Sequence, residues 1–145
     1  MSATIIGAWQ FWALLAAVFA ALTAILAKVG VSDVPSDLAT LLRTFVVVAL
    51  LAAIVAVTKQ WRSPASLPGR SLVFLALSGL ATGASWLCYF RALKLGDAAR
   101  VAPIDKLSIV LVAIFGVVFL GEKLAPVNWA GIALIALGAW LVTLR

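Results

Sequence analysis

Long apolar runs, separated by short polar segments, make up most of the chain. Each run is close to the roughly 20 residues that an α-helix needs to cross the hydrocarbon core. The runs are continuously apolar, which argues against membrane β-strands, since those alternate apolar and polar residues. The pattern predicts an all-α integral membrane protein with five transmembrane helices, at about residues 9–29, 38–58, 71–95, 98–120 and 127–144.

The polar segments carry residues that begin or end helices. Ser36 and Asp37 follow a proline and are expected to start the second helix with a polar cap. Gly96 and Asp97 form a tight turn between the third and fourth helices, and Pro126 is placed to open the fifth. Because no polar segment exceeds about a dozen residues, consecutive helices are expected to be antiparallel neighbours. We therefore expect residues 1–145 to form a single transmembrane domain.

Composition supports this class and excludes others. Hydrophobic residues are 66% of the chain and charged residues 11%, whereas soluble domains are nearer half apolar and about a quarter charged. The net charge of +6 comes from basic residues at span ends and in loops, as is usual in membrane proteins, so no nucleic-acid partner is expected. There is no histidine and only one cysteine, Cys88, so no metal site or cofactor is expected. No nucleophile–base pair or phosphate loop indicates an enzyme.

The loop charges are balanced between the two sides of the membrane. Five spans place the termini on opposite sides, which we call face A for the N-terminal side and face B for the C-terminal side. Each face has a net charge of +3 over all its charges, and each has four lysines or arginines near span ends: Lys59, Arg62, Arg70 and Lys123 on face A, and Lys28, Lys94, Arg100 and Arg145 on face B. Because lysine and arginine in short loops set the orientation of a membrane protein, this balance predicts dual topology, with two opposite copies forming an inverted pair. The alternative is that deeper basic residues also count and fix face B inside.

Four charged residues lie within the predicted spans, all toward face B: Arg43, Arg91, Asp105 and Lys106. Charges in a span are costly and are candidates for function, so we expect a polar vestibule that opens on face B. Asp105 lies two residues after Pro103, and a proline frees a backbone carbonyl in the preceding turn. Polar groups and an irregular backbone are therefore expected to coincide there, as a substrate or ion site.

Each of these residues also has a structural alternative. Arg91 and Asp105 flank the tight turn, so they are expected to form an ion pair, to belong to the site, or both. Lys106 lies about 100° around the helix from Asp105, so only one of the two is expected to face the pocket. The other is expected to form an ion pair at the side of the helix, and Lys106 has the further alternative of snorkelling toward the headgroups. Arg43 is expected either to line the vestibule or to snorkel toward the headgroups.

Two pairs of uncharged residues complete the candidates. Trp86 and Tyr89 lie within the third span, where they are expected either to line a solute pathway or to pack between helices. Gly131 and Gly138 are seven residues apart on one face of the fifth helix. Small residues let helices approach closely in lipid, so these two are candidates for a dimer interface.

Several stretches together resemble the drug/metabolite transporter (DMT) superfamily, specifically its EamA-type five-span half-unit. They run from Trp86 to Gly96, Ala98 to Pro103, Phe119 to Leu124 and Trp129 to Gly138. The resemblance covers nearly the whole chain, and the order of these stretches is more specific than any one of them. It implies an EamA-like, multidrug-resistance-transporter-like helical bundle in the cytoplasmic (inner) membrane of a prokaryote. Most EamA proteins are fused pairs of such units, so a single unit implies a homodimer.

The resemblance and the charges together predict a secondary transporter that exports a small metabolite. It is expected to work by alternating access as an antiparallel or dual-topology homodimer. Its expected partners are the lipid bilayer and a small-molecule solute, whose transport is coupled to protons or another ion. The basic excess favours an anionic or amphoteric solute. The alternatives are proton-coupled export of drugs or organic cations at Asp105, and a lipid-linked-sugar flippase or non-transporting membrane subunit. The four-span cation exporters carry a glutamate in their first helix, whereas the first span here has no acid.

Overall fold

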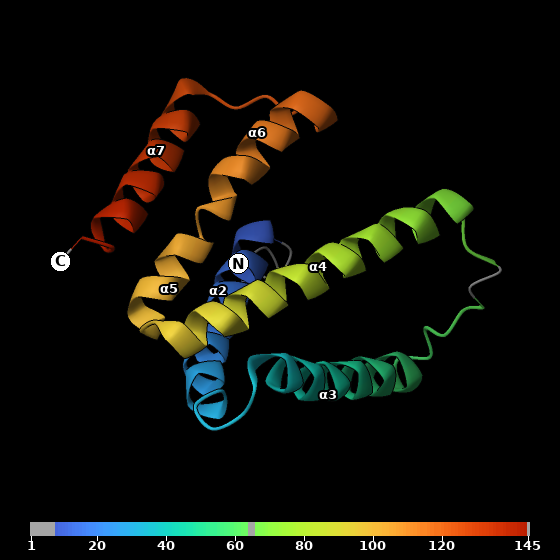
Figure 1. Cartoon of the computed structure of the whole chain (residues 1–145). Helices are drawn as coiled ribbons and strands as arrows, with labels where there is room; N and C mark the ends of the chain where they lie inside the picture. Colours follow the sequence, from blue (N-terminus) through green and yellow to red (C-terminus); the bar gives the residue numbers. More distant parts are fainter. Residues whose placement is uncertain (1–7, 64–65, 145) are drawn as a thin grey trace, which may run out of the picture. The chain divides into compact units, whose positions relative to one another are not determined.

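The computed structural model describes residues 8–63 and 66–144, and within these ranges all regular structure is helical. Figure 1 shows the helices, which are α2 (Trp9–Gly30), α3 (Ser36–Val57), α4 (Gly69–Leu95), α5 (Ala98–Asp105), α6 (Ser108–Leu120) and α7 (Pro126–Leu141). Their bounds differ from the predicted spans by no more than three residues, apart from the division of the fourth span into α5 and α6.

Four of the five predicted spans are long and apolar enough to cross a membrane: α2, α3, α4, and α5 with α6. The fifth, α7, is apolar but has 16 residues. At 1.5 Å per residue it rises about 24 Å, against a hydrocarbon core of about 30 Å. Large apolar side chains are exposed on all of the long helices, as a surface in contact with lipid requires. The all-α membrane class predicted from the sequence is confirmed.

The fourth span is interrupted two residues after its proline. Pro103 lies inside α5 and has no amide hydrogen to donate. Beyond it, the amides of Leu107 and Ile109 bond to the carbonyls of Ile104 and Lys106, three residues back instead of four. This tighter, 3₁₀-type turn separates α5 from α6. The backbone beside Asp105 is therefore irregular, but the irregularity lies after Pro103 and not in the preceding turn, where the proline was expected to free a carbonyl.

The end of α6 is closed by a left-handed residue. Gly121 has φ of 68°, a conformation that glycine adopts without steric cost. The amide of Glu122 then bonds to the carbonyl of Gly116 at 3.0 Å, which satisfies a carbonyl at the helix end. The turn brings the Glu122 carboxylate against Gly116, where an added Cβ would lie 2.6 Å from Oε2.

The chain forms two compact units, which we describe separately. The α3–α4 unit comprises residues 27–95, and in it α3 packs against α4. The two helices lie together where α3 begins and α4 ends, and they diverge toward the loop that joins them (Figure 1). The α5–α7 unit comprises the described residues of 1–26 and 96–145, and in it α7 packs on both α5 and α6.

Candidate functional site

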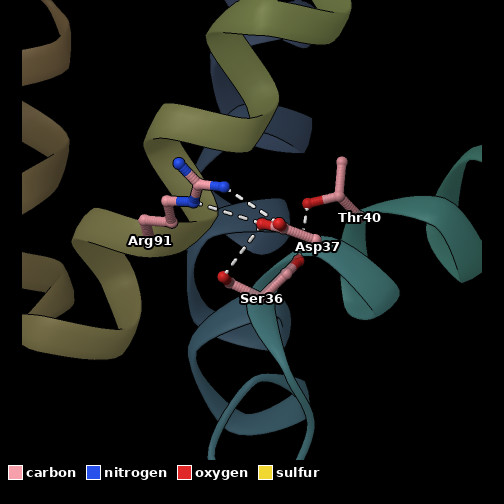
Figure 2. Close-up of polar contacts among 4 residues, drawn as sticks. All are labelled: Ser36, Asp37, Thr40 and Arg91. Atoms are coloured by element: carbon pink, nitrogen blue, oxygen red, sulfur yellow. Dashed lines mark hydrogen bonds and ion pairs between the residues drawn. The ribbon is translucent and has the colours of Figure 1, made fainter.

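An ion pair joins the start of α3 to the end of α4 in the α3–α4 unit. Arg91 donates from Nε to Oδ1 of Asp37 at 3.2 Å and from Nη2 to Oδ2 at 2.9 Å (Figure 2). The hydroxyl of Ser36 also donates to Oδ1 of Asp37, and Thr40 donates to the Ser36 carbonyl at 2.8 Å. Two parallel bonds between a guanidinium and a carboxylate fix the orientation of both groups.

Two lysines make further contacts at the same place. Lys28 Nζ donates to the carbonyl of Leu93 at 2.7 Å, and Lys94 Nζ donates to the carbonyl of Val34 at 2.9 Å. Leu93 lies in the last turn of α4, where carbonyls lack helical partners and cations are favoured. The side chains of Val31 and Leu93 are fully buried. We call the contacts of Lys28, Arg91 and Lys94 the basic clasp, since they fasten the α2–α3 segment to the end of α4.

The basic clasp changes the interpretation of Arg91. Arg91 was expected to pair with Asp105, to belong to the site, or both, and the structure pairs it with Asp37. Ser36 and Asp37 were expected to start α3 with a polar cap, yet the cap position is Pro35 and no side chain caps the helix. Both side chains of the pair are more than half exposed, and such pairs contribute little to stability in water. This geometry favours the structural alternative for Arg91.

Arg43 lies on the rings of two aromatic residues of α4. Its Cζ is 4.1 Å from the centroid of the Trp86 ring and 5.6 Å from that of Phe90. Both distances are within the range of a cation–π interaction. Tyr89 is on the same helix, three residues after Trp86. We call Arg43 with Trp86 and Phe90 the arginine seat.

The structure thus brings together two of the predicted site residues, Arg43 and Trp86. It also adds Phe90, which is buried and which the sequence analysis did not single out. Phe90 is four residues after Trp86, so the two side chains share a face of α4. That spacing is the signal by which Phe90 could have been found.

In the α5–α7 unit, Asp105 and Lys106 pair with each other. Lys106 Nζ is 3.2 Å from Oδ2 of Asp105, and the side chains are 52% and 36% exposed, respectively. We had expected the two to point in directions about 100° apart, with only one of them facing a pocket. The two side chains nevertheless touch, because the long, flexible lysine side chain turns back to its neighbour. Which of the two faces a pocket stays a prediction.

Gly131 and Gly138 are open toward the outside of their helix. A Cβ added at either residue would meet nothing within 4 Å in the described chain. The same holds for Gly79 and Gly83 of α4, so this openness does not by itself single out α7 as an interface. Among the described residues, no group of three or more potential ligands is arranged to hold a metal ion.

Comparisons with known proteins agree on one family. Residues 7–144 match the EamA-like transporter family. The chain is also 71% identical over 134 residues to a curated protein of Sinorhizobium sp named "Uncharacterized transporter in cobO 3'region". The alignment covers 92% of this chain and 95% of that relative. No solved structure matches the chain.

Proposed function

From the premise that the chain belongs to the EamA-like transporter family and is a multi-pass membrane transporter, we propose that it is a secondary transporter that exports a small metabolite. It works by alternating access as an antiparallel or dual-topology homodimer in the cytoplasmic membrane of a prokaryote. The bacterial relative supports this location.

The interruption between α5 and α6 is the observation that carries this proposal. Transporters commonly bind solutes and ions where a transmembrane helix is discontinuous, because freed backbone groups face the site there. The amides that would normally bond to the carbonyls of Pro103 and Asp105 bond elsewhere, so both carbonyls become available as acceptors. The Asp105–Lys106 pair lies at the same point. Irregular backbone at membrane depth is tolerated where it is covered by protein or lines a water-filled cavity, which supports a solute path at this break.

The number of helices supports a homodimer. The described residues form four helices long enough to cross a membrane and one shorter apolar helix, whereas the resemblance to EamA proteins implies that ten spans are needed for a complete transporter. The balanced charge of the two faces supports insertion in both orientations. The open sides of Gly131 and Gly138 supply a surface on α7 for close approach of a second copy.

Dual topology can be tested with a single cysteine in the loop between α3 and α4. We expect Ser66→Cys, in a Cys88→Ser background, to be labelled by a membrane-impermeant thiol reagent from both sides of the membrane in similar amounts. The control is the Cys88→Ser protein, which should remain unlabelled. Labelling from one side alone would contradict the dual arrangement and leave a fixed orientation.

Export of organic cations is the alternative, because Asp105 is the carboxylate at the helix break. Its partner Lys106 already compensates the charge, so a cation would have to displace the lysine. Transport of a metabolite through the same break requires no such displacement. The geometry therefore favours the metabolite over the cation.

The two functions are separated by flux measurements in proteoliposomes with a pH gradient. A panel of amino acids, organic acids, nucleosides and quaternary ammonium compounds would be supplied to the wild type, Asp105→Asn and Lys106→Gln. We expect flux of a non-cationic solute that falls at least about tenfold in both variants, as for other groups in a transport pathway. Asp33→Asn, an exposed loop acid bonded to Ser32, is the matched control and should retain flux.

Two results would overturn the proposal. Flux of quaternary ammonium compounds alone, with proton coupling lost in Asp105→Asn, would assign the cation-export function. Absence of flux for the whole panel with correctly folded protein would point instead to a non-transporting subunit or a lipid-linked-sugar flippase.

A further inference from the structure

The arginine seat holds the guanidinium by its flat face. Stacking on Trp86 and Phe90 occupies the π-surface of the group, but the N–H donors of an arginine lie in its plane and point outward from the edge. Among the described residues, the two ion pairs are Arg91–Asp37 and Lys106–Asp105, and neither includes Arg43. The edge of the Arg43 guanidinium is thus not used by a carboxylate of the described chain.

The donors of Arg43 are also accessible. In the described part of the chain, every side-chain nitrogen or oxygen that is sealed from solvent has a hydrogen-bond partner. Arg43 is half buried and donates no hydrogen bond within the described residues, so its nitrogens are not sealed. A molecule that reaches the seat can therefore meet the free edge of the guanidinium.

The depth of the group argues against snorkelling. Arg43 is seven residues after the first residue of α3, so its backbone lies about 10 Å from the start of the helix at 1.5 Å per residue. A snorkelling side chain would extend toward the start of α3. The end of α4 lies beside that start, and Phe90 is one helical turn closer to this end than Trp86 is. The guanidinium instead lies nearer to Trp86. The charge is held at a depth where an unpaired arginine is costly.

An oxyanion is the chemistry that fits this arrangement. A carboxylate is planar and matches the fork of N–H donors at a guanidinium edge. It also carries a single charge, which costs less to desolvate than a doubly charged phosphate. The aromatic rings around Arg43 suit an apolar body attached to that carboxylate.

We propose that the arginine seat binds the carboxylate of a small, largely apolar organic acid, and that such acids are the substrate class of this transporter. The proposal rests on the transport function proposed above. A lipid phosphate shares the oxyanion chemistry and is the competing source of the same contact.

Binding of benzoate to the purified protein tests the proposal. In a maltoside detergent, which contains no phosphate, isothermal titration should show binding of benzoate and at least tenfold weaker binding of its neutral isostere benzamide. Arg43→Gln should lower the affinity for benzoate at least tenfold. Arg43→Lys keeps the charge but loses the planar fork, and should lower it several-fold.

Arg70→Gln is the matched control. Arg70 also lies over a ring, with Cζ 5.8 Å from the centroid of Phe74, but it is at the opposite end of α4. We expect its loss to leave benzoate binding unchanged. Folding of each variant is checked by its elution profile and melting curve. If Arg43→Gln does not fold, the comparison of Arg43→Lys with wild type decides, and equal affinity for benzoate would overturn the proposal.

Two further measurements distinguish a lipid phosphate from an organic acid at the arginine seat, and the proposed substrate class from the proposed transport function. Phosphatidylglycerol added in mixed micelles should compete weakly with benzoate. Arg43-dependent binding of this lipid without any binding of benzoate would assign the seat to lipid and overturn the substrate class. If other solutes are transported and their flux is unchanged by Arg43→Gln, the proposed substrate class is overturned while the transport function stands. Benzoate binding without flux of any solute would support the seat and contradict the transport function.

Discussion

The two units compensate their intramembrane and span-end charges in different ways. In the α3–α4 unit, Arg91 and Asp37 are 54 residues apart in sequence, and Lys28 bonds to a carbonyl 65 residues away. In the α5–α7 unit, Lys106 and Asp105 are neighbours. A bond between distant residues holds two helices together, whereas a bond between neighbours offsets charge without joining elements.

This difference indicates which unit can deform. The basic clasp fixes the distance between the α2–α3 segment and the end of α4. The break between α5 and α6 has lost regular helical hydrogen bonds, and helices bend most readily at such points. Alternating access requires a change of shape around a binding site. We therefore expect the α5–α6 break to carry the conformational change and the clasped end of the α3–α4 unit to move as one piece.

Replacing Pro103 should produce the largest effect on transport, because it would remove the helix break that distinguishes the α5–α7 unit from the α3–α4 unit. Pro103→Ala restores an amide donor inside α5 and favours a continuous helix through residues 98–120. We expect solute flux in proteoliposomes to fall about tenfold or more, while stability rises by up to about 3 kcal/mol, the cost of a proline in a helix interior. Flux assays and thermal unfolding of the same preparation measure both quantities.

Opposite changes in flux and stability distinguish this explanation from simple damage. Pro126→Ala is the control, since Pro126 lies at the first turn of α7, where a proline removes no helical hydrogen bond. That variant should change neither quantity appreciably. If Pro103→Ala is more stable and still transports normally, the break is not needed for function. The conformational change would then not depend on the α5–α6 break.

An irregular backbone near Asp105 was predictable from sequence, because a proline disturbs a helix locally. Its position was not, since the missing Pro103 amide affects the preceding turn, whereas the altered bonds are those of Leu107 and Ile109. The five apolar spans were predictable for a similar reason, since their length is set by the thickness of the bilayer. The pairing of Asp105 with Lys106 was not foreseen, because the expectation assumed a regular helix at the point where the helix ends.

Contacts between helices needed information that the sequence does not contain. Arg43, Trp86 and Arg91 were each identified as candidates, but their partners depend on how far α3 is shifted along α4 and how each helix is rotated. A change of one residue in rotation moves a side chain by about 100°. This is why Asp37 was expected only as part of a polar helix start and instead pairs with Arg91, and why Phe90 was not anticipated.

A smaller effect is expected from weakening the basic clasp at its exposed ion pair. Asp37→Asn removes the charge that Arg91 contacts. Because both side chains are more than half exposed and exposed pairs contribute little, we expect the melting temperature in detergent to fall by only about 2 °C. Flux should change less than in Pro103→Ala. The loss should diminish in high salt, which screens exposed charges.

A double-mutant cycle makes the comparison quantitative. If the pair acts between helices, the effects of Asp37→Asn and Arg91→Gln are not additive, since the second substitution removes an interaction that the first has already broken. Arg70→Gln, at the other end of α4, should add its effect independently to that of Asp37→Asn. Additive effects for Asp37 and Arg91 would show that their ion pair does not help to hold α3 and α4 together. The clasp would then rest on Lys28 and Lys94, whose bonds to backbone carbonyls do not depend on Asp37.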